Sequence, residues 1–157
     1  MKLKREYDVI VVGGGPGGAV AAQMAAREGL DVLLIDKRQE IGAPVQCGEA
    51  IGYELISQWI DIDNPQWAAA YIDAFRIVGP TGESVRVPPT SPTMIVERKL
   101  FDRELVHQAV RAGAQALAKT RATDVIIENG YVCGVKMVCM GEECEARAKI
   151  VIGADGV

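Results

Sequence analysis

The chain has 157 residues, of which 49% are apolar and 24% charged, and its net charge is −4. This balance predicts one packed domain and disfavours a disordered chain. No basic stripe with interleaved aromatic residues occurs, and aromatic residues make up only 5% of the chain, so the composition predicts no nucleic-acid partner.

The N-terminal region predicts no export signal. Its apolar run, Tyr7–Val12, contains an aspartate and stops at a glycine, so it is too short for a signal-peptide core or a bilayer span. The four cysteines (Cys47, Cys133, Cys139 and Cys144) do not resemble a secreted disulfide framework in a chain of this length. We expect free thiols and a cytoplasmic protein, and a peripheral contact with the inner face of the membrane stays open.

The first elements form a strand–helix–strand unit. The apolar run Tyr7–Val12 predicts a strand that is buried on both faces. The alanine-rich segment Ala19–Glu28 predicts a helix that ends at Gly29, and Asp31–Asp36 predicts a second strand. A βαβ unit of this length begins a dinucleotide-binding fold.

The middle of the chain is less regular. The segment Lys37–Ala50 predicts a loop, and Tyr53–Ile60 predicts a short helix. A proline-rich insertion follows over Asn64–Pro92, with strands expected at Ala74–Val78 and Ser84–Val87 around a Pro-Thr-Gly turn.

The second half predicts one helix and several strands. Apolar spacing indicates a helix over Arg98–Ala112, which Gly113 ends. Hairpin turns are expected at Asn129-Gly130 and at Gly141-Glu142. The predicted strands, three of them in a meander, are Met94–Glu97, Ala114–Lys119, Asp124–Glu128, Tyr131–Met140, Cys144–Ala148 and Ile150–Ile152.

The glycine turn after the first strand has the spacing G-x-G-x-x-G. Gly13 allows a tight turn, Gly15 allows a pyrophosphate to approach the backbone, and Gly18 allows the helix and strand to pack closely. Gly17 lies in the same turn, where the start of the helix offers free N–H groups to phosphates. Asp36 ends the second strand, where an acid accepts hydrogen bonds from the adenosine ribose. A purely structural turn is the alternative.

NAD and FAD share this turn, so the turn alone does not choose between them. The Asp36 carboxylate disfavours a 2′-phosphate on the ribose, because like charges repel. Lys37 and Arg38, the next two residues, complicate that argument, although charges at a strand end are often merely solvated.

The most distinctive stretch is the loop Glu40–Ala50. It carries one thiol, Cys47, between flexible glycines, and it follows the acid expected at the ribose. A thiol in that place is reactive if its pKa is lowered, and is otherwise a small buried residue.

The order of elements resembles the FAD-binding fold of the glutathione-reductase type, in its para-hydroxybenzoate-hydroxylase branch. The long loop, the insertion, the helix that starts at Arg98 and the final strand before Gly153-Ala154-Asp155-Gly156 carry this resemblance. Within the branch, Tyr7–Gly18, the segment Pro44-Val45-Gln46-Cys47-Gly48-Glu49 and Phe101-Asp102 resemble the geranylgeranyl reductase family, particularly the archaeal digeranylgeranylglycerophospholipid reductases.

This resemblance implies a Rossmann-like α/β fold, FAD as cofactor and reduction of double bonds in the geranylgeranyl chains of membrane phospholipid precursors. It implies an isoprenoid lipid substrate and an electron donor, whether ferredoxin, a nicotinamide or another reduced carrier. One departure is Asp36, where the family more usually has glutamate. The residues expected at the cofactor are Gly13, Gly15, Gly17, Gly18, Asp36, Cys47, Gly48, Ala50, Arg98, Ala122 and Asp155.

Alternatives remain for several of these inferences. Arg98 could be a surface arginine that pairs with Glu97 or Asp102, and Asp155 could belong to a simple strand-end turn. An FAD-dependent aromatic monooxygenase and a non-catalytic dinucleotide-binding module are the rival functions. We expect residues 1–157 to be an FAD-binding domain without its substrate-binding part, and therefore inactive alone. The sequence predicts no metal site, and Cys47 is the one candidate for a catalytic side chain.

Overall fold

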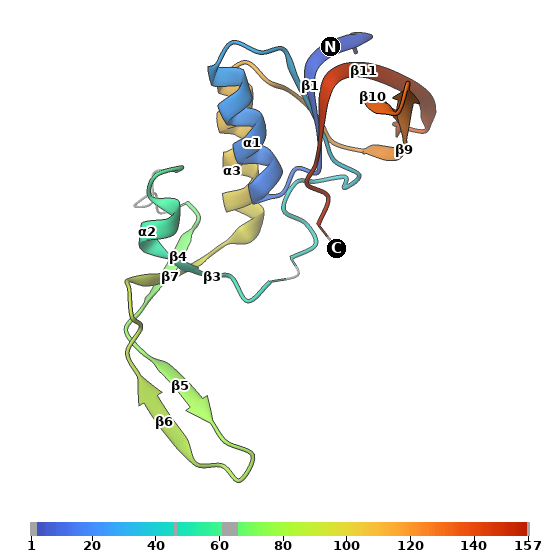
Figure 1. Ribbon diagram of the computed structural model, residues 1–157. Helices are drawn as coiled ribbons and strands as arrows, with labels where there is room; N and C mark the ends of the chain where they lie inside the picture. Colours follow the sequence, from blue (N-terminus) through green and yellow to red (C-terminus); the bar gives the residue numbers. More distant parts are fainter. Residues whose placement is uncertain (1–2, 46, 61–65, 157) are drawn as a thin grey trace. The chain divides into compact units, whose positions relative to one another are not determined.

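The computed structural model describes residues 3–45, 47–60 and 66–156 (Figure 1). It divides into two compact units, one formed by residues 1–44 and 102–157 and the other by residues 45–101. Whether they form one domain, as the sequence predicts, stays a prediction.

The first unit is built on a six-stranded sheet with the strand order β8-β2-β1-β11-β10-β9. Strands β8, β2, β1 and the second half of β11 run parallel, whereas β9, β10 and the first half of β11 form an antiparallel meander. The strands are β1 (Glu6–Val12), β2 (Val32–Ile35), β8 (Gln115–Leu117), β9 (Thr120–Glu128), β10 (Tyr131–Cys139) and β11 (Glu142–Gly153).

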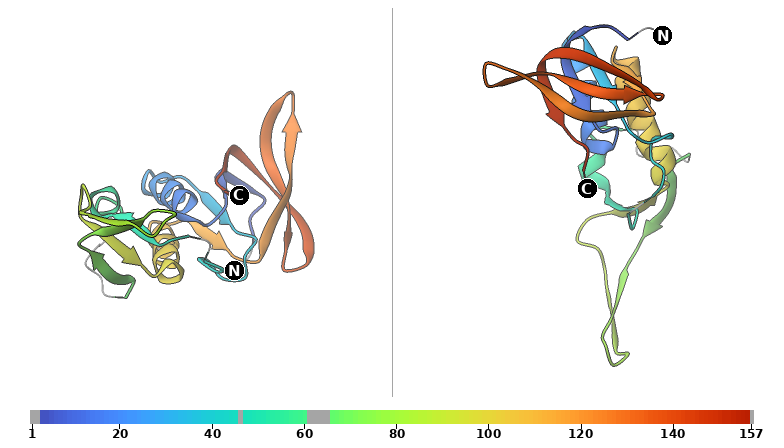
Figure 2. Two further views of the ribbon diagram at one scale, coloured as in Figure 1. Left: turned by 90° about the horizontal axis from the view of Figure 1, so that it is seen from below. Right: turned by 90° about the vertical axis from the view of Figure 1, so that its right-hand side faces the viewer.

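Two helices lie side by side against the parallel strands, and β9 and β10 lie on the other side (Figures 1 and 2). They are α1 (Pro16–Arg27) and α3 (Arg98–Arg111), joined by a hydrogen bond from Gln23 Nε2 to Gln108 Oε1 at 3.0 Å. The buried face of α1 consists mainly of glycine and alanine. Such small side chains let the helix approach the sheet closely, as the third glycine of the turn requires.

The core explains the apolar runs seen in the sequence. Ile10, Leu33 and Ile35 are fully buried and pack with Val135 and Met137 from the meander. All four residues of β2 are buried, because the helices cover one face of the sheet and the meander covers the other.

The second unit contains a three-stranded sheet with the order β3-β7-β4 and a separate hairpin of β5 and β6. The Trp67 ring packs edge-on against Phe101, with the ring centroids 5.4 Å apart. The elements, apart from the first turn of α3, are β3 (Ala50–Gly52), α2 (Tyr53–Ile56), β4 (Ala68–Ile72), β5 (Phe75–Val78), β6 (Ser84–Val87) and β7 (Thr93–Val96).

Most predicted elements are confirmed, and some differ from the prediction in their bounds. Helix α1 begins at Pro16 rather than Ala19, because proline suits the first helical position, where its missing N–H costs nothing. Helix α2 ends at Ile56 rather than Ile60. The sequence missed β3 and β4, because these short segments show no alternation of polar and apolar residues. The first two residues of the insertion predicted at Asn64–Pro92 lie outside the described residues.

The predicted separation of the last two strands is wrong. Strand β11 is continuous and pairs first with β10 and then with β1, so no break occurs between Ala148 and Ile150. The turn before β11 lies at Met140-Gly141, one residue earlier than expected. Both turn residues have positive φ, 51° and 95°, which is typical of a tight two-residue hairpin turn. Asn129-Gly130 forms the predicted turn in the same way.

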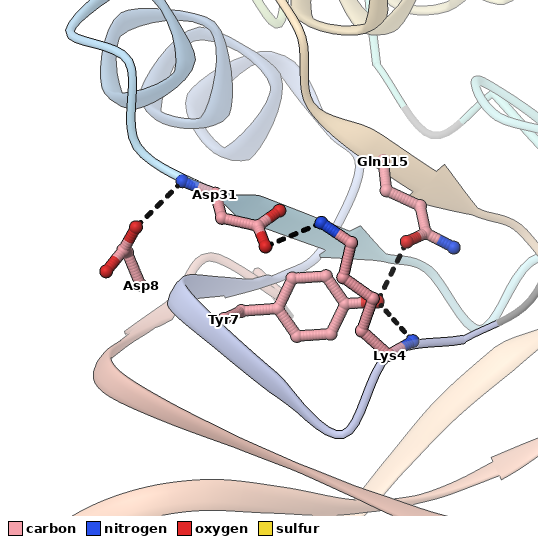
Figure 3. Close-up of polar contacts among 5 residues, drawn as sticks. All are labelled: Lys4, Tyr7, Asp8, Asp31 and Gln115. Atoms are coloured by element: carbon pink, nitrogen blue, oxygen red, sulfur yellow. Dashed lines mark hydrogen bonds and ion pairs between the residues drawn. The ribbon is translucent and has the colours of Figure 1, made fainter.

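A cluster of hydrogen-bonded polar residues lies where β1 and β8 begin (Figure 3). The Tyr7 hydroxyl donates to Gln115 Oε1 at 2.8 Å and accepts the backbone N–H of Lys4 at 3.0 Å. The Asp31 N–H donates to Asp8 at 3.0 Å. Burial raises the pKa of Tyr7, so this hydroxyl stays protonated at neutral pH and can donate.

Replacing Tyr7 with phenylalanine is expected to destabilise the fold by about 1–3 kcal/mol. The Gln115 side chain is 6% exposed and its Nε2 has no partner among the described residues, so Tyr7→Phe removes the only partner that the structure gives this amide. Urea denaturation measures the loss. Tyr131→Phe is the control, because Tyr131 is 78% exposed. Equal stability of the two variants would contradict the prediction.

The pKa of Asp8 is lowered, first by the hydrogen bond from Lys149 Nζ at 2.7 Å and then by the Asp31 N–H. A lowered pKa in the folded state means that this contribution to stability is present at neutral pH. It is lost as the pH falls through the folded pKa. Carboxyl NMR titration should place the Asp8 midpoint below the usual value for aspartate. Lys149→Met should raise it, and an unchanged midpoint in that variant would refute the assignment.

Candidate cofactor-binding site

The glycine turn joins the end of β1 to the start of α1, and two of its glycines are required by the fold. Gly13 has φ +110°, and an added Cβ there would lie 2.3 Å from the carbonyl oxygen of Ala154. A Cβ on Gly18 would lie 1.9 Å from the carbonyl oxygen of Gly13. No side chain fits at either position, so Gly13 and Gly18 permit the close packing of strand, turn and helix.

Gly15 and Gly17 lie in open space, unlike the other two glycines of the turn, because an added Cβ at either position meets nothing within 4 Å. Gly15 is the N-cap of α1, without a side-chain cap, and the first turn of the helix holds no acidic residue. The N–H groups at this end lack an acceptor within the helix, and the helix dipole makes the end positive. Open space beside uncapped N–H groups fits the pyrophosphate of a dinucleotide.

Asp36 follows β2 and is 6% exposed. Its Oδ2 accepts the Gly14 N–H and its Oδ1 accepts the Arg38 N–H, both at 2.7 Å. The carboxylate therefore holds the glycine turn in place. Each carboxylate oxygen can accept a further hydrogen bond, so both remain able to accept ribose hydroxyls.

A cavity of about 160 Å³ lies at the carboxyl ends of β1 and β2, where the adjoining part of the meander begins. Strand β1 has β2 as its neighbour on one side and β11 on the other, so the order of the strands reverses at β1. Ligands of such sheets bind at the point where the strand order reverses. Pockets for whole ligands are typically about 300–1,000 Å³, so this cavity suits one part of a larger molecule. Its lining residues are Val12, Gly13, Ile35, Asp36, Lys37, Arg38, Thr120, Arg121, Ala122 and Asp155.

The cavity brings together four of the predicted residues that are distant in the sequence: Gly13, Asp36, Ala122 and Asp155. The backbone holds them there, because Gly13 donates to the Ile35 carbonyl at 2.8 Å and Ala154 donates to the Val12 carbonyl at 2.8 Å. Their contact with a cofactor stays a prediction, and their shared cavity is what the structure adds.

The remaining predicted residues, Cys47, Gly48, Ala50 and Arg98, belong to the second unit, where Glu49 connects them. The Glu49 carboxylate accepts the Arg98 N–H at 3.2 Å, and its carbonyl accepts the Val96 N–H at 2.9 Å. The Cys47 loop is thereby fixed to the start of α3. Cys47 is exposed, and Gln46 lies outside the described residues. The approach of this group to a flavin stays a prediction.

Sequence reasoning missed three residues. Thr120 and Arg121 line the cavity, and Glu49 holds the Cys47 loop. Thr120 is placed by its N–H, which donates to the Asp36 carbonyl at 2.8 Å. This contact crosses from β9 to the end of β2, so no local pattern could have indicated it.

We also searched the part of the chain that the structure describes for metal sites, disulfides and membrane-spanning helices. It contains no group of three histidine, cysteine or acidic residues that could hold a metal ion. Cys47, Cys133, Cys139 and Cys144 are free thiols, as predicted. Among residues 3–45, 47–60 and 66–156, no helix has both the length and the apolar character needed to cross a bilayer.

Residues 8–156 match the model of the family described as FAD dependent oxidoreductase. The chain therefore belongs to this family, and the predicted cofactor, FAD, is confirmed at that level. The Rossmann-like α/β fold expected from the sequence is confirmed as well.

Individual curated proteins within this family show a more specific similarity. The chain is 50% identical to digeranylgeranylglycerophospholipid reductase 2 of Methanococcoides burtonii, over 99% of this chain and 39% of the relative. It is also 50% identical to digeranylgeranylglycerophospholipid reductase of Methanocella arvoryzae, over 99% of this chain and 40% of the relative. The chain thus spans about 40% of the length of these curated relatives, and the predicted family resemblance is confirmed.

Solved structures agree on the fold. A geranylgeranyl bacteriochlorophyll reductase-like protein from Thermoplasma acidophilum is similar with a TM-score of 0.86 and 39% identity, over 97% of this chain and 40% of that one. A myxobacterial chondrochloren halogenase has a TM-score of 0.83 at 24% identity, over 98% of this chain and 38% of that one. The second likeness concerns the fold alone.

Proposed function

We propose that the full-length gene product is an FAD-dependent reductase that saturates the double bonds of geranylgeranyl chains in archaeal membrane phospholipid precursors. The observation that carries this proposal is the 50% identity, over 99% of the chain, to two curated digeranylgeranylglycerophospholipid reductases. The cavity and the uncapped helix start support the cofactor part of the proposal.

In this proposal the first unit holds the ADP half of FAD. The start of α1 binds the pyrophosphate beside Gly15 and Gly17, where the structure leaves open space. Asp36 would accept the ribose hydroxyls, and the backbone at Ala122, which lines the same cavity, would contact the adenine. Once bound and reduced by the electron donor, FAD would supply a hydride to the double bond, and a proton would complete the saturation.

The second unit contributes the Cys47 loop. Glu49 links this loop to the first residue of α3, because its N–H donates to Cys47 Sγ at 3.4 Å and its carboxylate accepts the Arg98 N–H. We propose that Cys47, Gly48, Ala50 and Arg98 contact FAD, with Cys47 as the one candidate for a catalytic side chain.

The partners follow from the proposed reaction. The substrate is an isoprenoid lipid, and reduction of a double bond consumes two electrons, so a reduced carrier such as ferredoxin or a nicotinamide must supply them. We further propose that the protein works in the cytoplasm, in peripheral contact with the inner face of the membrane that contains its substrate.

Anaerobic turnover tests the proposal. The full-length protein is loaded with FAD, reduced with dithionite and incubated with a geranylgeranyl phospholipid, and the lipid is analysed by mass spectrometry. The expected product gains two hydrogens for each double bond reduced, and the control without reductant shows no gain. In a parallel reaction in air, oxygen consumption with a hydroxylated product would instead identify a monooxygenase. An unchanged lipid with FAD bound would favour a non-catalytic dinucleotide-binding module.

A further inference from the structure

The glycine turn has an apolar neighbour in the loop that follows β2, the side chain of Ile41. A Cβ added to Gly14 would lie 2.7 Å from Ile41 Cδ1 and 3.2 Å from Asp36 Oδ2. The Ile41 methyl group and the Asp36 carboxylate therefore both lie on the side of Gly14 where a side chain would project. The Gly14 N–H donates to this same Asp36 Oδ2 at 2.7 Å, so the methyl group lies close to a buried hydrogen bond to a charged group.

A tight turn holds Ile41 in this place. The Ala43 N–H donates to the Glu40 carbonyl at 3.3 Å, and Gly42, the third residue of this turn, has φ +82°. A positive φ at that position is typical of a type II turn, which favours glycine there. Gly42 is buried and Ile41 is half-buried. The Glu40–Ala43 turn is therefore packed against the first unit, with Ile41 as its second residue.

The contact with Ile41 also accounts for glycine at position 14, which the spacing G-x-G-x-x-G leaves open. Gly14 is not among the glycines with positive φ, so its backbone conformation does not require glycine. The space does, because the position of a Gly14 side chain is already occupied by Ile41 and Asp36.

The Ile41 side chain protects the hydrogen bond that orients the carboxylate. Asp36 is 6% exposed. Water that reaches a carboxylate competes for its donors, and a hydrogen bond is stronger where water is excluded. Ile41 does not line the cavity beside Asp36, so it can act on a ligand there only through the residues that it covers.

We infer that Ile41 is a positioning residue for the carboxylate at the ribose site. It covers the hydrogen bond between Gly14 and Asp36, and thereby holds Asp36 in one orientation towards the cavity. This inference rests on the proposed function, because it assumes that the ribose of FAD binds at Asp36.

Hydrogen exchange and ligand titration of the full-length apoprotein test this role. Ile41→Ala should speed the exchange of the glycine-turn amides, which mass spectrometry follows in a peptide that spans the turn. It should also lower the affinities for FAD and 5′-AMP by about tenfold, because a hydrogen bond to a charged group is weakened. The affinity for FMN, which lacks adenosine, should be unchanged, whereas a general loss of structure would lower it as well.

Three further variants serve as controls. Ile41→Met keeps an apolar side chain long enough to reach Gly14 and should bind FAD like the wild type. Ile41→Val removes only the Cδ1 methyl group, so it should show a smaller change in the same direction and decides the question if Ile41→Ala does not fold. Ile127→Ala is the matched control, because Ile127 is 60% exposed on β9, and it should change neither exchange nor affinity.

A double-mutant cycle tests the contact from the other side. Gly14→Ala should lower the affinity for FAD, because the new methyl group displaces Ile41 Cδ1. In the Ile41→Ala background the same change has more room, and it should lower the affinity by less than about threefold further. Effects that multiply in the double variant would contradict the inference.

The outcomes distinguish the inference from the function beneath it. If the wild type binds neither FAD nor 5′-AMP, the proposed function fails and the inference fails with it. If the wild type binds both, and Ile41→Ala and Ile41→Val leave their affinities and the exchange unchanged, only the inference fails.

Discussion

Replacing Gly18 with alanine should destabilise the first unit by about 3 kcal/mol or more, because the new Cβ has no room. It would lie 1.9 Å from the Gly13 carbonyl oxygen and 3.2 Å from Ala154 Cβ. Backbone atoms cannot give way as a flexible side chain can, so α1 must move away from β1. Bound flavin should be lost together with stability.

Urea denaturation and flavin absorbance of the full-length protein measure both effects of Gly18→Ala. Gly17→Ala is the matched control, since Gly17 is the preceding residue of the same helix and an added Cβ there meets nothing. That variant should be at least as stable as the wild type, because alanine suits a helix better than glycine. If Gly18→Ala denatured like Gly17→Ala, the packing argument would be wrong.

Gly15→Val should retain the fold, in contrast to Gly18→Ala, and should lower the affinity for FAD by roughly 100-fold. The backbone at Gly15 has φ −72° and ψ −179°, a conformation open to any residue, and the space beside it is empty. A side chain there would keep the pyrophosphate from the N–H groups at the start of α1. Each lost hydrogen bond to a charged group costs about 1.5–3 kcal/mol, and 1.4 kcal/mol is about tenfold in affinity.

Fluorescence titration of the apoprotein with FAD measures the affinity of the Gly15→Val variant, and circular dichroism with urea denaturation confirms its fold. A variant that binds FAD like the wild type would mean that the pyrophosphate does not approach this turn. A variant that unfolds would mean that Gly15 has a structural role, which the open space around it argues against.

The sequence predicted the first unit well because its signals there are local. A strand buried on both faces, a glycine turn and an alanine-rich helix each follow from a few adjacent residues, and so does the hairpin turn at Asn129-Gly130. Strands β3 and β4 depend on pairing with β7, a contact made across the insertion. The continuous course of β11 likewise depends on its two different neighbours.

The same distinction applies to the candidate site. The spacing of Gly13, Gly18 and Asp36 is a local signature with a known physical purpose. Ala122 and Asp155 were expected only through the family resemblance, and the structure brings them into the cavity with Gly13 and Asp36. No local sequence pattern could have indicated Arg121. Its place in the cavity depends on the contact between the start of β9 and the end of β2.

The central claim is that the first unit holds the ADP half of FAD, and a comparison of FAD with FMN tests it most directly. FMN carries the flavin ring but lacks the adenosine, so it cannot use the cavity or Asp36. Full-length apoprotein should bind FAD roughly 100-fold or more tightly than FMN, as the loss of about 3 kcal/mol of contacts requires, and 5′-AMP should compete with FAD. Equal affinity for the two flavins, or FAD binding that 5′-AMP does not weaken, would contradict the account.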